Sequence, residues 1–192
     1  MMLYFSLTAV SQEREATILF NDSTSVKGFA EVKKEKIYFK VSPTAEVSEW
    51  SYDIAYGLIF SGYGYSEKYV YVTPGKYAKK PKLMEVIEEG KVNLYKESSL
   101  GYNVGIGVSA SKSGIGAGPT LSYDFSTVYY VQRKNEAYAT DITFSFKNNT
   151  LKYFSDCKAL VEKIKKREFI KKDIVDIVYY YNDYCGEPEE EN

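Results

Sequence analysis

The chain has 192 residues, of which 44% are hydrophobic and 27% charged, and its formal net charge is −1. This composition is typical of one globular domain. The near-neutral charge argues against a dedicated nucleic-acid binder, which needs excess Lys and Arg to displace phosphate counterions. His is absent, which excludes Ser-His-Asp and Cys-His nucleophile systems and zinc sites that need imidazole. Catalysis by paired carboxylates stays open.

The first residues are typical of the end of a signal peptide. Residues 1–10 (MMLYFSLTAV) form a short apolar run, and Ala9 and Ser11 offer small side chains at the cleavage-determining positions. The polar sequence that follows at once, together with the shortness of the run, argues against a membrane span. We therefore expect a signal peptide over residues 1–11, although it lacks a positively charged start, and a mature chain from Gln12. A buried first strand is the alternative.

A β-rich region is predicted over residues 12–154. Alternating and β-branched segments predict strands at 16–20, 25–32, 36–41, 50–60 and 69–73, with turns at Asn21-Asp22-Ser23, Ser42-Pro43 and Pro74-Gly75. Residues 83–87 and 91–95 predict a hairpin, although the first could also form a helical turn. Further strands are expected at 127–132 and at 140–146, the latter followed by a turn at Asn148-Asn149.

Residues 97–126 are unusually rich in Gly and Ser. They show no helical period and hold too much Gly for a stiff strand, so we expect a long mobile loop inserted in a hairpin. Weak alternation at Val104, Ile106 and Val108 leaves room for an irregular extended ribbon. Residues 107–113 resemble a phosphate-binding loop, but the second Gly and the following helix are missing, so a flexible loop is the better interpretation.

The period becomes helical from residue 155. Ser155 is a suitable N-cap, and Cys157, Leu160, Val161 and Ile164 form an apolar stripe. A second helix is predicted from about Lys171 to Tyr184, and residues 187–192 form an acidic tail expected to be disordered.

The two helices are predicted to form an antiparallel hairpin over residues 155–186, because only a few residues join them. That arrangement places Cys157, at the start of the first helix, beside Cys185, at the end of the second. They are the two cysteines of the chain, and we favour a disulfide between them, which agrees with export. Two buried free thiols are the alternative.

Three segments of the chain resemble a group of uncharacterised exported proteins of Bacteroidota. The segments are LMEVIEEGKVNLYK, VYYVQRK and the ending LKYFSDCKALVEKIKKREFIKKDIVDIVYYYNDYC, with its Ser-Asp-Cys and Tyr-Tyr-Asn-x-x-Cys motifs. The resemblance implies a cell-envelope location. It carries no known activity, and so no catalytic residue can be transferred.

Tyrosines offer the candidate binding surface. Tyr63, Tyr65, Tyr69 and Tyr71 share parity, so an unbroken strand would place them on one face, where they could stack on sugars or contact a protein. The alternative is that they are half-buried strand residues whose hydroxyl groups are exposed to solvent.

Two charged segments have simpler interpretations. The Lys-rich segment 163–172 is either an anion-binding surface or, preferably, a solvated helix tip. Asp173 and Asp176 are neighbours on a helix, but two carboxylates are too few for calcium, so we interpret them as surface charges.

These observations predict an α+β protein with a bent or half-barrelled antiparallel sheet followed by a C-terminal antiparallel two-helix hairpin. We expect a non-catalytic exported protein, periplasmic or cell-surface associated, which binds another envelope protein or has a structural role. A glycan-binding module that uses its tyrosines is the second hypothesis, and a carboxylate-only enzyme is the third. No catalytic residue, cofactor, metal, nucleic acid or transmembrane segment is predicted.

Overall fold

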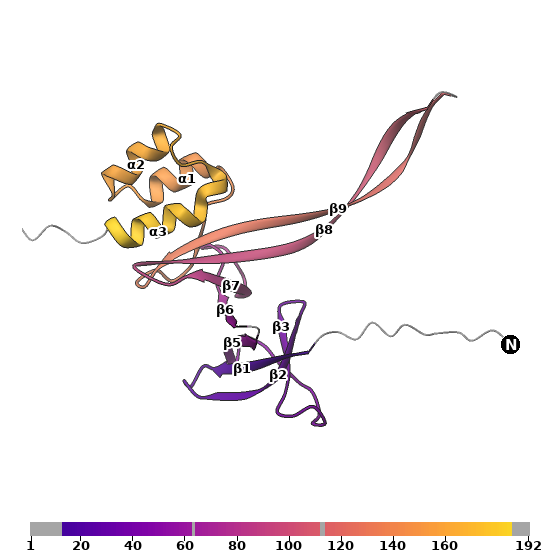
Figure 1. Ribbon diagram of the computed structural model, residues 1–192, viewed down its shortest axis with the longest axis vertical. Coiled ribbons are helices and arrows are strands. Elements are labelled where there is room, and N and C mark those ends of the chain that lie inside the picture. Colours follow the sequence, from indigo (N-terminus) through magenta and orange to yellow (C-terminus); the bar gives the residue numbers. More distant parts are fainter. Residues whose placement is uncertain (1–12, 63, 112–113, 186–192) are drawn as a thin grey trace, which may run out of the picture. The chain divides into compact units, whose positions relative to one another are not determined.

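The computed structural model describes residues 13–62, 64–111 and 114–185, with the backbone alone described for 98–111 and 114–126. The chain divides into two compact units, Met1–Val86 and Ile87–Asn192. The strands pair antiparallel throughout, and the described helices belong to the second unit (Figure 1). The predicted α+β class, an antiparallel sheet followed by a C-terminal helix pair, is confirmed.

The strands of the first unit lie in the order β7-β6-β5-β1-β2-β3-β4. Their bounds are β1 Arg14–Phe20, β2 Ser25–Lys33, β3 Lys36–Lys40, β4 Ser48–Trp50, β5 Ala55–Gly62, β6 Tyr65–Val72 and β7 Lys82–Glu88, the last belonging to this unit as far as Val86. The predicted turn at Asn21-Asp22-Ser23 joins β1 to β2. Asp22 Oδ1 accepts hydrogen bonds from the backbone N–H of Thr24 at 2.9 Å and from its hydroxyl at 2.6 Å.

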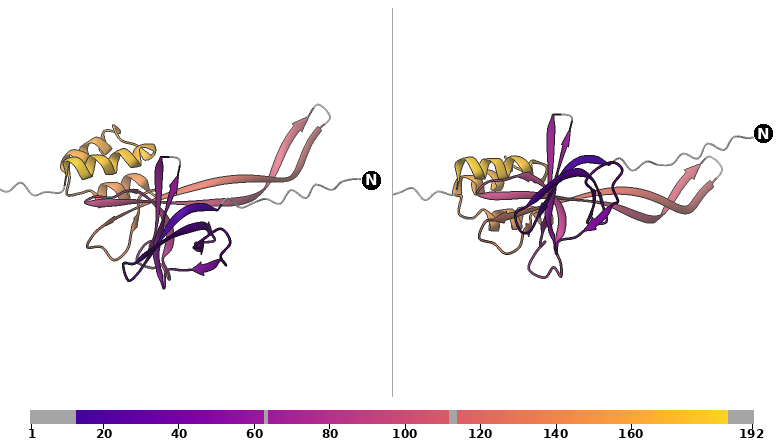
Figure 2. Two further views of the ribbon diagram at one scale, coloured as in Figure 1. Left: turned by 60° about the horizontal axis from the view of Figure 1, so that its bottom comes forward. Right: turned by 90° about the horizontal axis from the view of Figure 1, so that it is seen from below.

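The sheet of the first unit curls on itself, as both views in Figure 2 show. Tyr71 on β6 donates its hydroxyl to the carbonyl of Glu35, at 2.8 Å, in the turn between β2 and β3. The hydroxyl also lies 3.4 Å from the carbonyl oxygen of Trp50 on β4. Since these strands are separated by others in the sheet order, the contacts are possible only because the sheet is strongly bent.

The inside of this bend is apolar. Its buried members are Ala16, Ile18, Ala30, Ile37, Phe39, Ala55, Leu58 and Phe60. Gly57 permits one close approach of strands there, because a Cβ at this position would overlap the carbonyl oxygen of Tyr69 on β6. The period-two pattern of the sequence therefore supplies one apolar face, and the bend lets this face bury itself.

The second unit begins with two long paired strands, β8 (Val92–Ser111) and β9 (Gly114–Arg133), and a short β10 (Thr140–Asp141). The register runs without interruption from Val92↔Arg133 to Ser111↔Gly114. Most of the Gly- and Ser-rich segment 97–126 therefore lies in paired strands and not in a loop. The continuous antiparallel pairing of the two strands outweighs the low strand preference of Gly here.

Three helices follow the strands: α1 (Phe146–Tyr153), α2 (Lys158–Lys165) and α3 (Ile174–Tyr184), the last preceded by a short 3-10 turn, Lys171–Asp173. They gather at the base of the β8–β9 pair, which continues beyond them as a two-stranded ribbon (Figure 1). Their buried core includes Leu94 and Val131 from the strands and Phe154, Leu160 and Ile177 from the helical region.

The strand predicted at 140–146 is wrong beyond its first two residues. Asp141 Oδ1 accepts the backbone N–H groups of Thr143, at 2.7 Å, and Phe144, at 3.0 Å, and these bonds turn the chain out of the sheet. Ser145 then adopts a left-handed conformation (φ 47°) and α1 begins. The turn expected at Asn148-Asn149 therefore lies inside a helix. A side chain that bonds its neighbouring backbone outweighed the alternation of Ile142, Phe144 and Phe146.

Helix α2 also begins later than expected. Cys157, not Ser155, is its N-cap, and it makes no side-chain capping bond. The predicted pairing of the cysteines is confirmed: Cys157 and Cys185 form a disulfide with a Cα–Cα distance of 5.6 Å. Because the bridge joins the start of α2 to the end of α3, these helices run antiparallel, as the sequence predicts.

Candidate functional site

The tyrosines of β6 do not form one exposed platform. Tyr65 is 56% exposed, whereas Tyr69 and Tyr71 pack against the core of the first unit. Burial raises the pKa of each of these two phenols to about 12. Tyr63 lies outside the described residues. The structure therefore supports the packing interpretation of Tyr69 and Tyr71.

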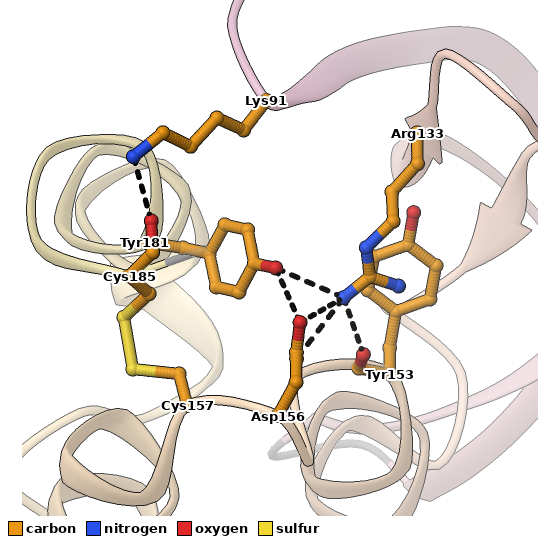
Figure 3. The surroundings of a disulfide bond; sticks show 7 residues. All are labelled: Lys91, Arg133, Tyr153, Asp156, Cys157, Tyr181 and Cys185. Atoms are coloured by element: carbon orange, nitrogen blue, oxygen red, sulfur yellow. Dashed lines mark hydrogen bonds and ion pairs between the residues drawn. A yellow bond between two sulfur atoms is a disulfide. The ribbon is translucent and has the colours of Figure 1, made fainter. Parts of the chain in front are cut away.

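The strongest polar cluster of the described side chains lies instead beside the disulfide, at Arg133 (Figure 3). Arg133 stands at the end of β9, Asp156 immediately precedes the bridged Cys157, and Tyr181 lies on α3. Arg133 Nη2 donates to both carboxylate oxygens of Asp156 at 3.1 Å and to the Tyr181 hydroxyl at 3.2 Å. Tyr181 in turn donates its hydroxyl to Asp156 Oδ2 at 2.6 Å.

Tyr153, at the end of α1, extends the cluster. The guanidinium of Arg133 lies 4.5 Å from the centre of the Tyr153 ring, a cation–π arrangement, and Nη2 donates to the Tyr153 carbonyl at 3.1 Å. The Tyr153 hydroxyl donates to Glu136 Oε2 at 2.7 Å. One arginine thus ties the end of the sheet to α1, to the α1–α2 turn and to α3.

The environment of the cluster fixes its protonation. Burial raises the pKa of Tyr153, and its hydrogen bond to Glu136 raises it further. Burial likewise raises the pKa of Tyr181, with the hydrogen bond to Asp156 acting in the same direction. Burial opposes the charge of Arg133, but its hydrogen bond with Tyr181 leads to a net raised pKa. At neutral pH the two phenols are therefore hydrogen-bond donors and the guanidinium is charged.

A second set of bonds holds α3 on the sheet. Asn182 accepts the backbone N–H of Val92 at 2.9 Å and donates to the carbonyl of Val92 at 3.0 Å, so one amide satisfies both peptide groups. Lys91 donates to the carbonyl of Cys185 at 2.8 Å (Figure 3). The bridged end of α3 is therefore fixed beside the start of β8.

The cluster forms one wall of an open cleft of about 570 Å³, within the size range of small-molecule sites. The lining residues are Arg133, Glu136, Tyr138, Thr140, Asn149, Lys152, Tyr153, Ser155 and Asp156. Two cations and two carboxylates balance one another in this set. Since the formal charges cancel, the cleft selects neither anions nor cations by net charge, and it offers donors, acceptors and aromatic rings together.

Sequence reasoning did not find this cleft. Its residues come from the end of β9, the loop after it, β10, α1 and the turn before α2, and no local spacing connects them. The one available signal was the position of Asp156 beside a cysteine predicted to be bridged, which places its carboxylate at the junction of two elements.

The other charged segments have surface roles in the structure. Within the Lys-rich segment 163–172, Lys163 pairs with Glu168 at 3.0 Å, and just before it Glu162 pairs with Lys165 at 2.9 Å. Asp173 accepts the backbone N–H of Ile170 at 2.9 Å. Among the described residues, no group of three or more His, Cys, Asp or Glu side chains is arranged to hold a metal ion.

Comparison with protein-family models, curated proteins and solved structures finds no match for this chain. The described residues contain no helix long and apolar enough to cross a membrane. The resemblance to exported Bacteroidota proteins stays a prediction from the sequence.

Proposed function

We propose that the chain is a non-catalytic, exported cell-envelope protein that binds a neutral, polyhydroxylated ligand in the Arg133 cleft. The observation that carries the binding role is the lining of the cleft, which combines balanced charges with tyrosines. The observation that supports export is the Cys157–Cys185 disulfide, because such bonds persist in oxidising compartments.

The chemistry of the lining favours a glycan over a charged metabolite. Sugar hydroxyls both donate and accept hydrogen bonds, so they can use the carboxylates of Glu136 and Asp156 as well as the ammonium of Lys152. Tyr138 is 38% exposed at the cleft and offers a ring on which a sugar can stack. The glycan hypothesis is thereby kept, but with different tyrosines from those of β6.

Binding without catalysis is proposed because the charged groups are held in a structural network. Arg133 bonds Asp156, and Glu136 accepts from Tyr153, so these carboxylates have partners that also hold the helices on the sheet. Such groups suit positioning of a ligand better than proton transfer, in which a catalytic carboxyl must change its protonation during the reaction.

The binding test is a glycan array followed by calorimetric titration of any ligand found. Tyr138→Ala should weaken binding about fivefold, because aromatic contacts contribute on the order of 1 kcal/mol. Tyr179→Ala is the matched control: Tyr179 is 43% exposed on the same unit but does not line the cleft. We expect it to bind as the unsubstituted chain does, and the glycan should be recovered uncleaved.

Three results would contradict parts of this proposal. An array without a ligand for the folded, disulfide-bonded chain argues against a glycan. Binding that survives Tyr138→Ala argues against the cleft, and one stoichiometric protein co-purified from the envelope favours the protein-binding hypothesis instead. Export is tested separately by the unreduced mass of the chain from its native cell. That mass should begin at Gln12 and carry no alkyl group after thiol alkylation.

A further inference from the structure

The β8–β9 ribbon is divided into two faces of opposite chemistry. Successive residues of a strand lie on opposite faces, and the register pairs even-numbered residues of β8 with odd-numbered residues of β9. One face thus carries the even positions 100–110 (L, Y, V, I, V, A) and the odd positions 115–125 (I, A, P, L, Y, F). Every residue of this face is apolar or aromatic.

The opposite face carries small and polar residues. The odd positions 101–111 read G, N, G, G, S, S, and the even positions 114–124 read G, G, G, T, S, D. Charged residues form 27% of the chain, yet between 98 and 126 they occur at Lys112 and Asp124 alone. A ribbon exposed to water on both faces has no reason to avoid charge on one face and to concentrate Ile, Val and Leu there.

The length of the apolar face matches the hydrocarbon core of a bilayer. Each strand carries the pattern over 11 positions, 100–110 and 115–125. At about 3.3 Å per residue this is about 35 Å, which a tilt of about 45° reduces to about 25 Å, the height of the apolar band on strands that cross membranes.

Aromatic residues gather at one end of this face. Tyr102 and Tyr123 are paired, and Phe125 pairs with Leu100, at the end of the pattern nearest the helices. Aromatic residues are enriched where membrane-crossing strands meet the interface.

We infer that residues 98–111 and 114–126 are the two strands of a membrane-inserting hairpin whose apolar face contacts the lipid bilayer, and that several copies insert together. The need for several copies follows from the edge of β9. Among the described residues β10 is the strand paired with this edge, and only at Tyr130 and Val131. Hydrocarbon does not tolerate unpaired peptide groups, so the hairpins of neighbouring copies pair edge to edge in a closed ring, with the Gly- and Ser-rich face toward water.

The alternation of the two faces can be measured directly in the full chain. Since both native cysteines are in the bridge, one introduced cysteine is the single thiol available for an environment-sensitive fluorophore. We would label positions 103 to 108 one at a time and add phosphatidylcholine vesicles. Emission should rise and shift to the blue at 104, 106 and 108 and stay water-like at 103, 105 and 107. No change at any position, or an equal change at all six, would overturn the inference.

A matched pair of variants tests insertion by release of a dye trapped in the same vesicles. Val104→Lys with Leu121→Lys charges one cross-strand pair of the apolar face, and Asn103→Lys with Ser122→Lys charges the adjacent pair of the polar face. The first variant should release dye at least tenfold more slowly than the unsubstituted chain, and the second within twofold of it. Equal loss in both variants, or an unsubstituted chain that forms oligomers in water and releases no dye, would overturn the inference.

Discussion

The two units bury an apolar sheet face in different ways. In the first unit the sheet bends until its own strands cover the core, and the phenol of Tyr71 bonds the turn and strand that the bend brings close. In the second unit helices cover the base of the strands β8 and β9, and a disulfide and the Arg133 cluster hold these helices in place. Bending thus buries the apolar face of the first unit, whereas packing against helices buries that of the second.

Removing the disulfide should produce the largest difference between the units. Cys157→Ser with Cys185→Ser opens a loop with a sequence separation of 28, which should cost the second unit about 3.5 kcal/mol in the chain-entropy model. The described helices all lie in that unit, so their circular dichroism reports its unfolding. Trp50, the one tryptophan of the chain, reports the first unit. Equal shifts of both signals would show that the units unfold as one.

A matched pair of core truncations sharpens the same comparison. Leu58 in the first unit and Leu160 in the second are both fully buried, and each change to Ala should cost about 3 kcal/mol. We expect Leu58→Ala to lower the denaturant midpoint of Trp50 fluorescence, and Leu160→Ala to lower that of the helical signal. A Leu160→Ala variant whose Trp50 transition moves as far would contradict independent cores.

The smallest expected effect concerns the closure of the bend. Tyr71→Phe removes the hydroxyl that bonds Glu35 and approaches Trp50, at a cost of about 1 kcal/mol to the first unit. Urea unfolding followed by Trp50 fluorescence at neutral pH measures this cost. An unchanged midpoint would show that these bonds do not hold the bend.

The same variant should alter the response to alkaline pH. Burial raises the pKa of Tyr71 from 10.0 to about 12, so the folded state keeps a proton that the unfolded state loses first. The resulting stability is complete below pH 10 and is lost as the pH rises toward about 12. Tyr71→Phe should therefore lose less stability over this interval than the unsubstituted chain. Tyr69 has a similarly raised pKa, so the Tyr71→Phe variant should still lose some stability over the same pH interval.

Local patterns predicted most strands because each strand shows its own alternation. The strand predicted at 25–32 appears as Ser25–Lys33, and that predicted at 36–41 as Lys36–Lys40. The helical period likewise predicted α2 and α3. Helix α1 was missed because Asp141 redirects the chain through its side chain, and this competes with an alternation that alone predicts a strand.

The candidate cleft could not be predicted in the same way. Arg133 and Asp156 are 23 positions apart and meet only when α1 and α2 pack on the end of β9. For the tyrosines of β6 the local prediction was sound but its consequence was not. Tyr69 and Tyr71 lie on one face of the strand, as the alternation predicts, but that face packs against the core of the first unit.

The sequence by itself determined the α+β class, the position of most strands, the antiparallel pair α2 and α3 and the pairing of Cys157 with Cys185. These follow from periodicity and from the length of one short connection, which act over a few neighbouring residues. Only the tertiary structure decided the bend of the first sheet, the partners of Arg133 and the register that separates the two faces of the β8–β9 ribbon. Each of these depends on which distant segments pack or pair, and a pattern of neighbouring residues does not specify those partners.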